Sequence, residues 1–232
     1  MLILGIESST LTASAAVVKD GAVLAADDVP APTHSDVLLV TIDRVMKQAG
    51  VAPVELTAVA VGAGPGSFTG LRIGMSTAKG IAFAAGTPLY AISSLAALAQ
   101  DAAAAGAQGV IVPAMDARRG ELYVGFYRAD GTQLAPDRVI APAELAAAID
   151  ALRDGGPAIV LGDGLAAHAL SVTAPIVARP DLRATPSALA VATIASRGGH
   201  ADALLDGAPR YIRPAEAEIL YPDGVPGALR KR

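Results

Sequence analysis

Residues 2–29 read LILGIESSTLTASAAVVKDGAVLAADDV, and this stretch decides the fold. It contains three apolar runs, at 2–6, 13–19 and 22–29, each of a length that suits one strand. The last two runs are joined by Asp20-Gly21, a pair that accepts the positive φ angles of a two-residue hairpin turn. We therefore predict that the chain begins with three consecutive antiparallel strands.

After these strands the pattern alternates between helices and strands, and the same order then repeats. In the first half we predict helices at 35–49, 71–85 and 93–105, and strands at 58–61 and 89–92. In the second half we predict strands at 110–115, 121–127, 134–140 and 158–161, and helices at 143–153 and 187–196. This order predicts an α/β fold of two tandem ribonuclease-H-like subdomains, the actin-like ATPase (ASKHA) architecture, with mixed sheets flanked by helices. A Rossmann domain fits less well, because it would begin with strict βαβ alternation.

The segment Gly106-Ala107-Gln108-Gly109 separates the two repeats. Because glycines punctuate regular structure, we place the first subdomain at 1–106 and the second at 107–200. The remaining residues, 201–232, are rich in proline, glycine and charge, which predicts an extended C-terminal tail.

The composition limits the classes of function. With 53% hydrophobic and 17% charged residues, the chain can bury a full core. The absence of cysteine excludes disulfides, thiolate metal sites and cysteine nucleophiles. Aromatic residues make up only 3%, which is few for a protein that stacks single-stranded bases. The net charge is −4 and the one compact basic cluster is Arg230-Lys231-Arg232, so the sequence shows no broad basic face for tight binding of a nucleic acid by the chain alone.

The first apolar run is short and is interrupted by Glu7, which argues against a signal peptide. No uncharged apolar run approaches the ~20 residues that span a bilayer. We therefore expect no membrane association and a cytoplasmic location.

The most distinctive local motif is the stretch GAGPGSFTG at 62–70, which joins a predicted strand to a predicted helix. Free backbone N–H groups and the helix dipole favour an anion at such a helix start. The stretch is not a Walker A loop, because no Lys-Ser or Lys-Thr pair follows, and position 69 is Thr where a dinucleotide fingerprint needs Gly. The alternative is a tight turn that lets helix and strand approach closely, and the residues by themselves favour this structural role.

A second polar turn, Glu7-Ser8-Ser9-Thr10, ends the first strand. In actin-like ATPases such a turn faces the nucleotide phosphates and a metal, but a plain polar turn explains the residues equally well. The matching turn of the second half carries Arg118 and Arg119, whereas paired glycines there would favour phosphate binding. This difference weakens the hypothesis that the chain is an ATPase. These arginines are either solvated or contact RNA or a partner. The candidate nucleotide-binding residues are Glu7, Ser8, Ser9, Gly64, Gly66, Ser67 and Thr69.

Two predicted helices carry more apolar surface than one sheet can cover. Helix 71–85 has only two charges, Arg72 and Lys79, on one face, and helix 35–49 has a broad predicted core stripe that includes Leu39. We expect a protein partner to cover the remainder, and burial between the two subdomains is the alternative. The candidate partner-interface residues are Val37, Val40, Arg72, Met75, Ala78, Lys79 and Phe83.

The motifs of several catalytic classes are missing. His34, His168 and His200 are isolated, with no H-x-x-x-H or H-E-x-x-H pair, so we predict no metal site. No G-x-S-x-G elbow is present, which argues against a hydrolase triad, so we predict no catalytic residues.

Several motifs together resemble the TsaB (YeaZ) family, the accessory subunits of bacterial tRNA threonylcarbamoyladenosine synthesis. They are IESS at 6–9, HS at 34–35, GPGSFTGLRIG at 64–74, AKG at 78–80, DARRGE at 116–121 and YIRP at 211–214. The resemblance is strong over residues 1–100 and rests beyond them on the last two motifs.

The resemblance implies an actin-like fold and a non-catalytic scaffold that binds the catalytic subunit TsaD through the helices of the first half. The ATPase TsaE would join that pair, and the chain would form a homodimer when TsaD is absent. TsaD carries an H-x-x-x-H metal pair where this chain has Ser94 and Leu98. Since Leu98 cannot ligate a metal, we expect no threonylcarbamoyl transfer by this chain and no required cofactor, with weak ATP or ADP binding left open.

The alternative hypothesis is an independent actin-like ATPase or kinase, motivated by the Glu7 turn and the glycine-rich stretch. A protease, suggested by the family's older glycoprotease name, has no supporting motif.

Overall fold

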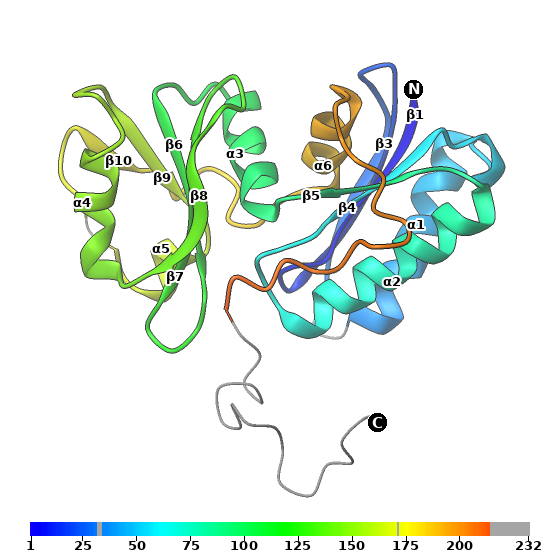
Figure 1. Cartoon of the computed structure of the whole chain (residues 1–232), viewed down its shortest axis with the longest axis horizontal. Coiled ribbons are helices and arrows are strands. Elements are labelled where there is room, and N and C mark those ends of the chain that lie inside the picture. Colours follow the sequence, from blue (N-terminus) through cyan, green and yellow to red (C-terminus); the bar gives the residue numbers. More distant parts are fainter. Residues whose placement is uncertain (32–33, 171, 214–232) are drawn as a thin grey trace, which may run out of the picture.

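The computed structural model describes residues 1–31, 34–170 and 172–213. Two five-stranded mixed sheets lie side by side, each with helices packed against it (Figure 1). This arrangement confirms the predicted fold class.

The first sheet has the strand order β3-β2-β1-β4-β5. Its strands are β1 (Leu2–Glu7), β2 (Thr12–Lys19), β3 (Ala22–Pro30), β4 (Ala58–Gly62) and β5 (Leu89–Ile92). β1 pairs antiparallel with β2 and parallel with β4. The predicted hairpin is confirmed, because Asp20 and Gly21 both have positive φ. The central strands β1 and β4 are almost wholly buried, as expected where helices cover both faces.

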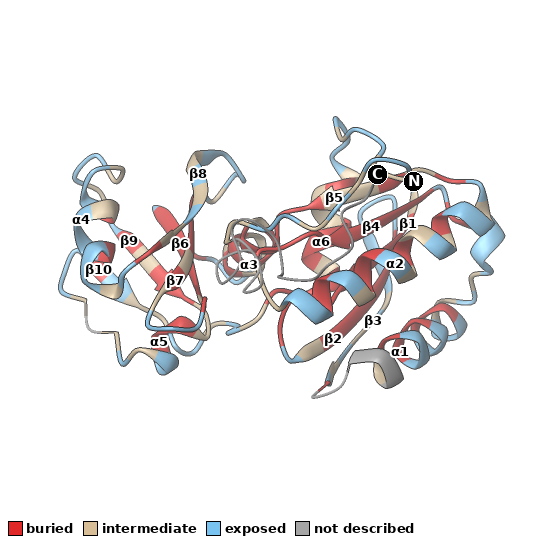
Figure 2. Cartoon of the chain, turned by 60° about the horizontal axis from the view of Figure 1, so that its bottom comes forward, coloured by how far each residue is buried: buried red, intermediate tan, exposed pale blue. Residues whose placement is uncertain are grey.

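Helices cover both faces of the first sheet. α1 (His34–Ala49) and α2 (Phe68–Ala85) pack on one face, and the 3₁₀ turn η1 (Pro53–Glu55) lies against α2. α6 (Ala188–Ser196) packs on the other face against β1, β2 and β4. Figure 2 shows that α1 and α2 turn buried sides toward the sheet and exposed sides toward solvent.

The second sheet repeats this topology in the order β10-β9-β6-β7-β8. Its strands are β6 (Val110–Asp116), β7 (Leu122–Arg128), β8 (Gln133–Ile140), β9 (Ala158–Leu161) and β10 (Ile176–Ala178). The helical elements beside it are η2 (Pro142–Glu144), α4 (Leu145–Asp150) and α5 (Gly164–Ala167). The sequence analysis did not predict β10, η2 or α5, which are too short to show a periodic pattern.

Most predicted boundaries lie within one residue of the structure, but α2, α4 and the subdomain boundary differ by more. α2 begins three residues early, because Ser67 caps it by accepting a hydrogen bond from the Gly70 N–H at 3.3 Å. α4 is shorter than the predicted 143–153, because Pro142 starts a 3₁₀ turn. α6 falls within the range 107–200 predicted for the second subdomain, yet it packs on the first sheet. No helix in the described ranges is both long and apolar enough to cross a bilayer.

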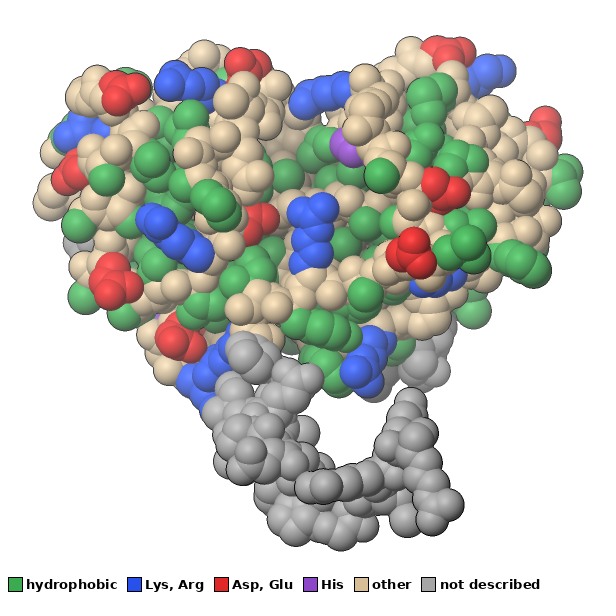
Figure 3. Space-filling view, in the orientation of Figure 1, with side chains coloured by type: hydrophobic (Ala, Val, Ile, Leu, Met, Phe, Trp, Pro, Cys, Tyr) green, Lys and Arg blue, Asp and Glu red, His purple; other side chains and the backbone are tan. Residues whose placement is uncertain are grey.

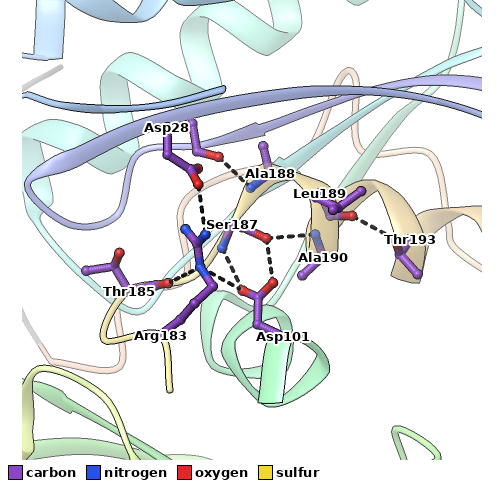
Figure 4. A network of polar contacts seen from close by, with 10 residues as sticks. Asp28, Asp101, Arg183, Thr185, Ser187, Ala188, Leu189, Ala190 and Thr193 are labelled. Atoms are coloured by element: carbon purple, nitrogen blue, oxygen red, sulfur yellow. Dashed lines mark hydrogen bonds and ion pairs between the residues drawn. The ribbon is translucent and has the colours of Figure 1, made fainter. Parts of the chain in front are cut away.

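α3 (Ser94–Ala104) packs against β6, β7 and α6, and so links the two sheets. Its Asp101 carboxylate accepts hydrogen bonds from the Ser187 hydroxyl at 2.6 Å and from the Ser187 N–H at 3.0 Å (Figure 4). Arg183 lies 3.7 Å from Asp101 and donates to Asp28 of β3 at 2.8 Å. Ser187 also caps α6 by accepting from the Ala190 N–H. The network therefore ties β3, α3 and the start of α6 together.

The buried Asp101 generates a prediction about pH. Burial raises the pKa of Asp101 from 3.8 to about 6, although Ser187 and Arg183 act in the opposite direction. Because the folded pKa is raised, this carboxyl stabilises the fold most below its unfolded pKa, and the contribution is lost as pH rises to about 6. We expect Asp101 to lower the free energy of unfolding by about 2 kcal/mol between pH 4 and pH 7. Urea denaturation across that range should show this component in the parent chain and not in Asp101→Asn.

The matched control is Asp43→Asn, which alters an exposed carboxylate that pairs with Lys47 on the same helix. It should keep the parent pH profile. Parallel profiles for the parent chain and Asp101→Asn would contradict the prediction.

Candidate functional site

A cleft of about 670 Å³ lies between the two sheets. Most of its lining comes from the β1–β2 turn, the start of α2 with the loop before it, the β6–β7 turn, and residues 210–213, and Asp163 and Thr185 complete it. A concave region lined by both halves of an α/β protein is where a ligand would bind, so the predicted site residues are compared with its lining.

Four of the seven candidate nucleotide-binding residues line the cleft, namely Ser9, Gly66, Ser67 and Thr69. Gly66 has a φ of 155°, and a Cβ there would overlap the backbone oxygen of Ser9. The Ser67 N–H donates to that same oxygen at 2.7 Å. The β1–β2 turn and the α2 N-terminus are therefore in direct backbone contact, as both interpretations of the glycine-rich stretch require.

The other three candidates, Glu7, Ser8 and Gly64, do not line the cleft, which gives no support to their prediction as nucleotide ligands. All three are buried. The Glu7 carboxylate accepts hydrogen bonds from the Ser9 N–H at 2.6 Å and the Ser94 hydroxyl at 2.8 Å. Burial raises the pKa of Glu7, and the hydrogen bonds from Ser9 and Ser94 lower it. Since the strand carries this side chain inward, Glu7 cannot face a phosphate or a metal in the cleft.

The buried Glu7 also accounts for Ser94. The Ser94 hydroxyl donates a hydrogen bond to Glu7 and accepts one from the Gly64 N–H at 3.2 Å. Its donor and an acceptor site are therefore both used inside the protein. Leu98, one turn along α3, is fully buried among apolar side chains. The described residues include no group of three or more His, Asp or Glu side chains that could hold a metal ion.

The β6–β7 turn supplies charge to the cleft. Arg118 and Arg119 both have positive φ, which is uncommon for arginine. The Arg118 N–H donates to the Asp116 carboxylate at 2.8 Å, and His168 contacts the same carboxylate at 3.1 Å. Burial first, and then the charge of Asp116, raise the pKa of Asp163. The turn therefore brings charges of both signs to the cleft.

No broad basic patch is visible on the face drawn in Figure 3, where Lys and Arg side chains are scattered. The basic cluster at 230–232 lies outside the described residues.

The sequence analysis missed the role of residues 210–213, which it assigned to a tail. The Arg210 N–H donates to the Ala63 oxygen at 2.6 Å, and the Tyr211 ring lies 5.1 Å from the Phe68 ring. The described part of the tail is therefore a wall of the cleft. The Tyr-Ile-Arg run was the only signal in the sequence for it.

Some of the candidate partner-interface residues on α1 and α2 are exposed, and others are buried. The exposed fractions are 57% for Val40 and 78% for Phe83, and Leu39, predicted to be in the core, is 58% exposed. Met75 and Ala78 are buried at 4% and 0%, so their prediction as interface residues is wrong. The helical period turns them toward the sheet together with Leu71 and Ala82.

The remaining candidates lie at the edge of this surface. Val37 is only partly exposed and packs against the first core. Arg72 donates to the Tyr211 hydroxyl at 3.0 Å, and Lys79 donates to the Leu205 oxygen at 3.3 Å. Both cations therefore contact the chain's own C-terminal segment.

Comparison with known proteins identifies the family. The family model described as "TsaD: tRNA N6-adenosine threonylcarbamoyltransferase" matches residues 28–219. The tRNA threonylcarbamoyladenosine biosynthesis protein TsaB of Bacillus subtilis is 31% identical over 95% of this chain and 98% of its own length. TsaB of Escherichia coli is 35% identical to this chain, and the match covers 56% of each protein.

Solved structures agree with these relatives. YeaZ from Pseudomonas aeruginosa superposes with a TM-score of 0.78 at 29% identity, covering 90% of this chain and 99% of that one. A more distant neighbour is the activator of the 2-hydroxyisocaproyl-CoA dehydratase from Clostridium difficile, solved with bound ADPNP. It superposes with a TM-score of 0.51 at 12% identity, and the match covers 85% of this chain and 95% of that one. This likeness shows a shared fold and nothing more. The chain belongs to the TsaB (YeaZ) family of tRNA threonylcarbamoyladenosine biosynthesis proteins.

Proposed function

We propose that this chain is a cytoplasmic, non-catalytic scaffold subunit that binds a TsaD-like catalytic subunit during threonylcarbamoyl transfer to tRNA adenosine. A TsaE-like ATPase joins the pair, tRNA is reached only through the complex, and the chain forms a homodimer through the same surface when it is alone.

The exposed apolar side chains of α1 and α2 carry the proposal. Leu39, Val40 and Phe83 lie in solvent on the helices that cover one face of the first sheet. Ser76, Gly80 and Ala84 are also exposed on α2, so the helix offers a small-residue surface around Phe83. Large apolar side chains that protrude beside small residues are typical of helix–helix interfaces. Two exposed helices therefore present a surface suited to another protein's helices.

The state of Glu7, Ser94 and Leu98 supports a non-catalytic role. The polar groups at the end of β1 bond to one another inside the protein, and Leu98 offers no ligand atom. A catalytic centre needs groups that can reach a substrate. Here the corresponding positions have become part of the core.

The first test replaces Phe83 by Arg. Because Phe83 is exposed, the variant should fold like the parent, while a charge at the centre of an apolar interface should weaken binding by about 30-fold or more, or ~2 kcal/mol. Co-purification and titration calorimetry with the TsaD-like subunit of the same cell measure this loss.

The matched control is Val177→Arg, an exposed apolar residue on β10 of the second sheet. It should bind the TsaD-like subunit as the parent does. Undiminished binding by Phe83→Arg would reject the surface, whereas catalysis of the transfer by the isolated chain would reject the scaffold role itself.

A second candidate function is weak nucleotide binding in the cleft without turnover. Its support is the set of Ser9, Gly66, Ser67 and Thr69 at the start of an 18-residue helix, beside a cavity of about 670 Å³. Helix N-termini favour phosphate groups. The buried Glu7 argues against phosphate hydrolysis, because no acidic side chain of the β1–β2 turn reaches the cleft.

Thr69→Glu tests this candidate. Thr69 lies in the first turn of α2, where a carboxylate suits the helix dipole but repels a phosphate, so we expect folding to be preserved and ATP affinity to fall about tenfold. Calorimetry with ATP and magnesium measures the affinity, and a phosphate-release assay tests for turnover.

Ser76→Glu, two turns further along α2, should bind ATP like the parent. Equal affinities for the parent and Thr69→Glu would place any bound nucleotide elsewhere, and turnover that Glu7→Ala abolishes would favour an independent ATPase or kinase.

A further inference from the structure

Residues 202–213 leave the first sheet and run along α2 toward the second sheet (Figure 1). The segment contains no helix or strand, yet it is bound at several points along its length. Each point of attachment involves a different part of the fold.

The first attachment is to the edge of the first sheet. The Ala203 N–H donates to the Leu89 oxygen at 2.7 Å, and the Leu89 N–H donates to the Asp202 carboxylate at 3.0 Å. These bonds satisfy backbone groups of β5 that would otherwise form an open sheet edge. One end of the segment is therefore fixed to the first sheet.

The second attachment is to α2 and the loop before it. Tyr211 stacks on Phe68 and accepts a hydrogen bond from Arg72, whose guanidinium carbon lies 3.8 Å from the Phe68 ring centroid. The Arg210 N–H donates to Ala63. Stacking, a cation–π contact and a backbone hydrogen bond thus hold the segment at the cleft.

The third attachment is to the second sheet. Arg213 donates to the Ala117 oxygen at 3.1 Å and lies 3.3 Å from the Glu121 carboxylate, both in the β6–β7 turn. A planar guanidinium can serve a carbonyl and a carboxylate at the same time, because it carries five donors. Arg213 therefore connects a segment anchored on the first sheet to the opposite wall of the cleft.

The other chain crossings between the sheets touch the cleft at one lining residue, Thr185. They run through α3 and the segment that leads into α6, where the Asp101 network joins them. Among the described residues, α3 and α6 contribute nothing to the cleft lining, whereas 210–213 do. The two sheets are thus joined by a hinge-like connection at these helices and, separately, by the C-terminal segment at the cleft.

We propose that residues 202–213 act as a strap that holds the cleft closed, with Arg213 as its attachment to the second sheet. Opening the cleft then requires either the loss of the Arg213 contacts or the release of Tyr211 from α2. Because Arg72 and Lys79 of α2 also contact the strap, movement of the strap changes the edge of the surface formed by α1 and α2.

Distances between spin labels test the strap. Because the chain contains no cysteine, Ser76→Cys on α2 and Ala166→Cys on α5 create two unique labelling sites on exposed positions of the two halves. Double electron–electron resonance on the full chain, diluted with unlabelled protein, reports the distance between them. We expect Arg213→Ala and Tyr211→Ala to shift the distribution to longer distances, although they act on opposite ends of the strap.

Two controls make the test specific. Arg179→Ala removes an exposed arginine that pairs with Asp181 next to the second sheet, and it should leave the distribution unchanged. Glu121→Gln keeps the shape of the side chain and removes its charge, so it should give a smaller shift in the same direction. Circular dichroism confirms that each variant is folded. Unchanged distances in folded Arg213→Ala, or a shift with Arg213→Ala but none with Tyr211→Ala, would overturn the proposal.

Discussion

The buried carboxylate of Glu7 is the constraint on which the first half of the molecule depends. It lies at the end of β1 and bonds to the backbone of the β1–β2 turn and to the first residue of α3. A Cβ at Gly62 would overlap this carboxylate, so β4 can end beside it only with glycine. Because an unpaired buried charge costs several kcal/mol, the turn, the end of β4 and the start of α3 are held in one arrangement.

That arrangement determines what each side of the first sheet can do. With the polar groups at the end of β1 turned inward, the cleft keeps a helix N-terminus, hydroxyls and the charges of the β6–β7 turn, but no acidic side chain from the first half. With α2 held by Ser67 at its start, the apolar residues Leu71, Met75, Ala78 and Ala82 face the sheet. Phe83 of α2 is left exposed to solvent, as are Leu39 and Val40 of α1. The first half thus contributes hydroxyl and backbone groups to the cleft and exposed apolar side chains to the outer surface of α1 and α2.

The two halves share a topology but not a chemistry. Both sheets have three antiparallel strands followed by parallel ones, and the turn after the first strand faces the cleft in each half. In the first half a backbone contact between Gly66 and Ser9 closes the turn. In the second half, Arg118 and Arg119 adopt positive φ and Asp116 accepts the turn's N–H. The halves are joined by buried polar contacts at α3 and α6, and by Arg213 at the cleft.

The sequence by itself determined the fold class, the hairpin at Asp20-Gly21, the repeat of topology and the family, because turn chemistry, hydrophobic periodicity and short motifs depend on residues that are neighbours in the chain. It could not determine which polar residues at the end of β1 face the cleft, since the direction of Glu7 depends on Ser94, 87 positions away. Nor could it show that Met75 of α2 is buried and Phe83 is exposed, because the sequence pattern is the same whether an apolar side chain packs on the sheet or on a partner. The path of residues 202–213 was decided only by tertiary structure, because their bonds reach distant parts of the chain, among them Leu89, Phe68 and Ala117.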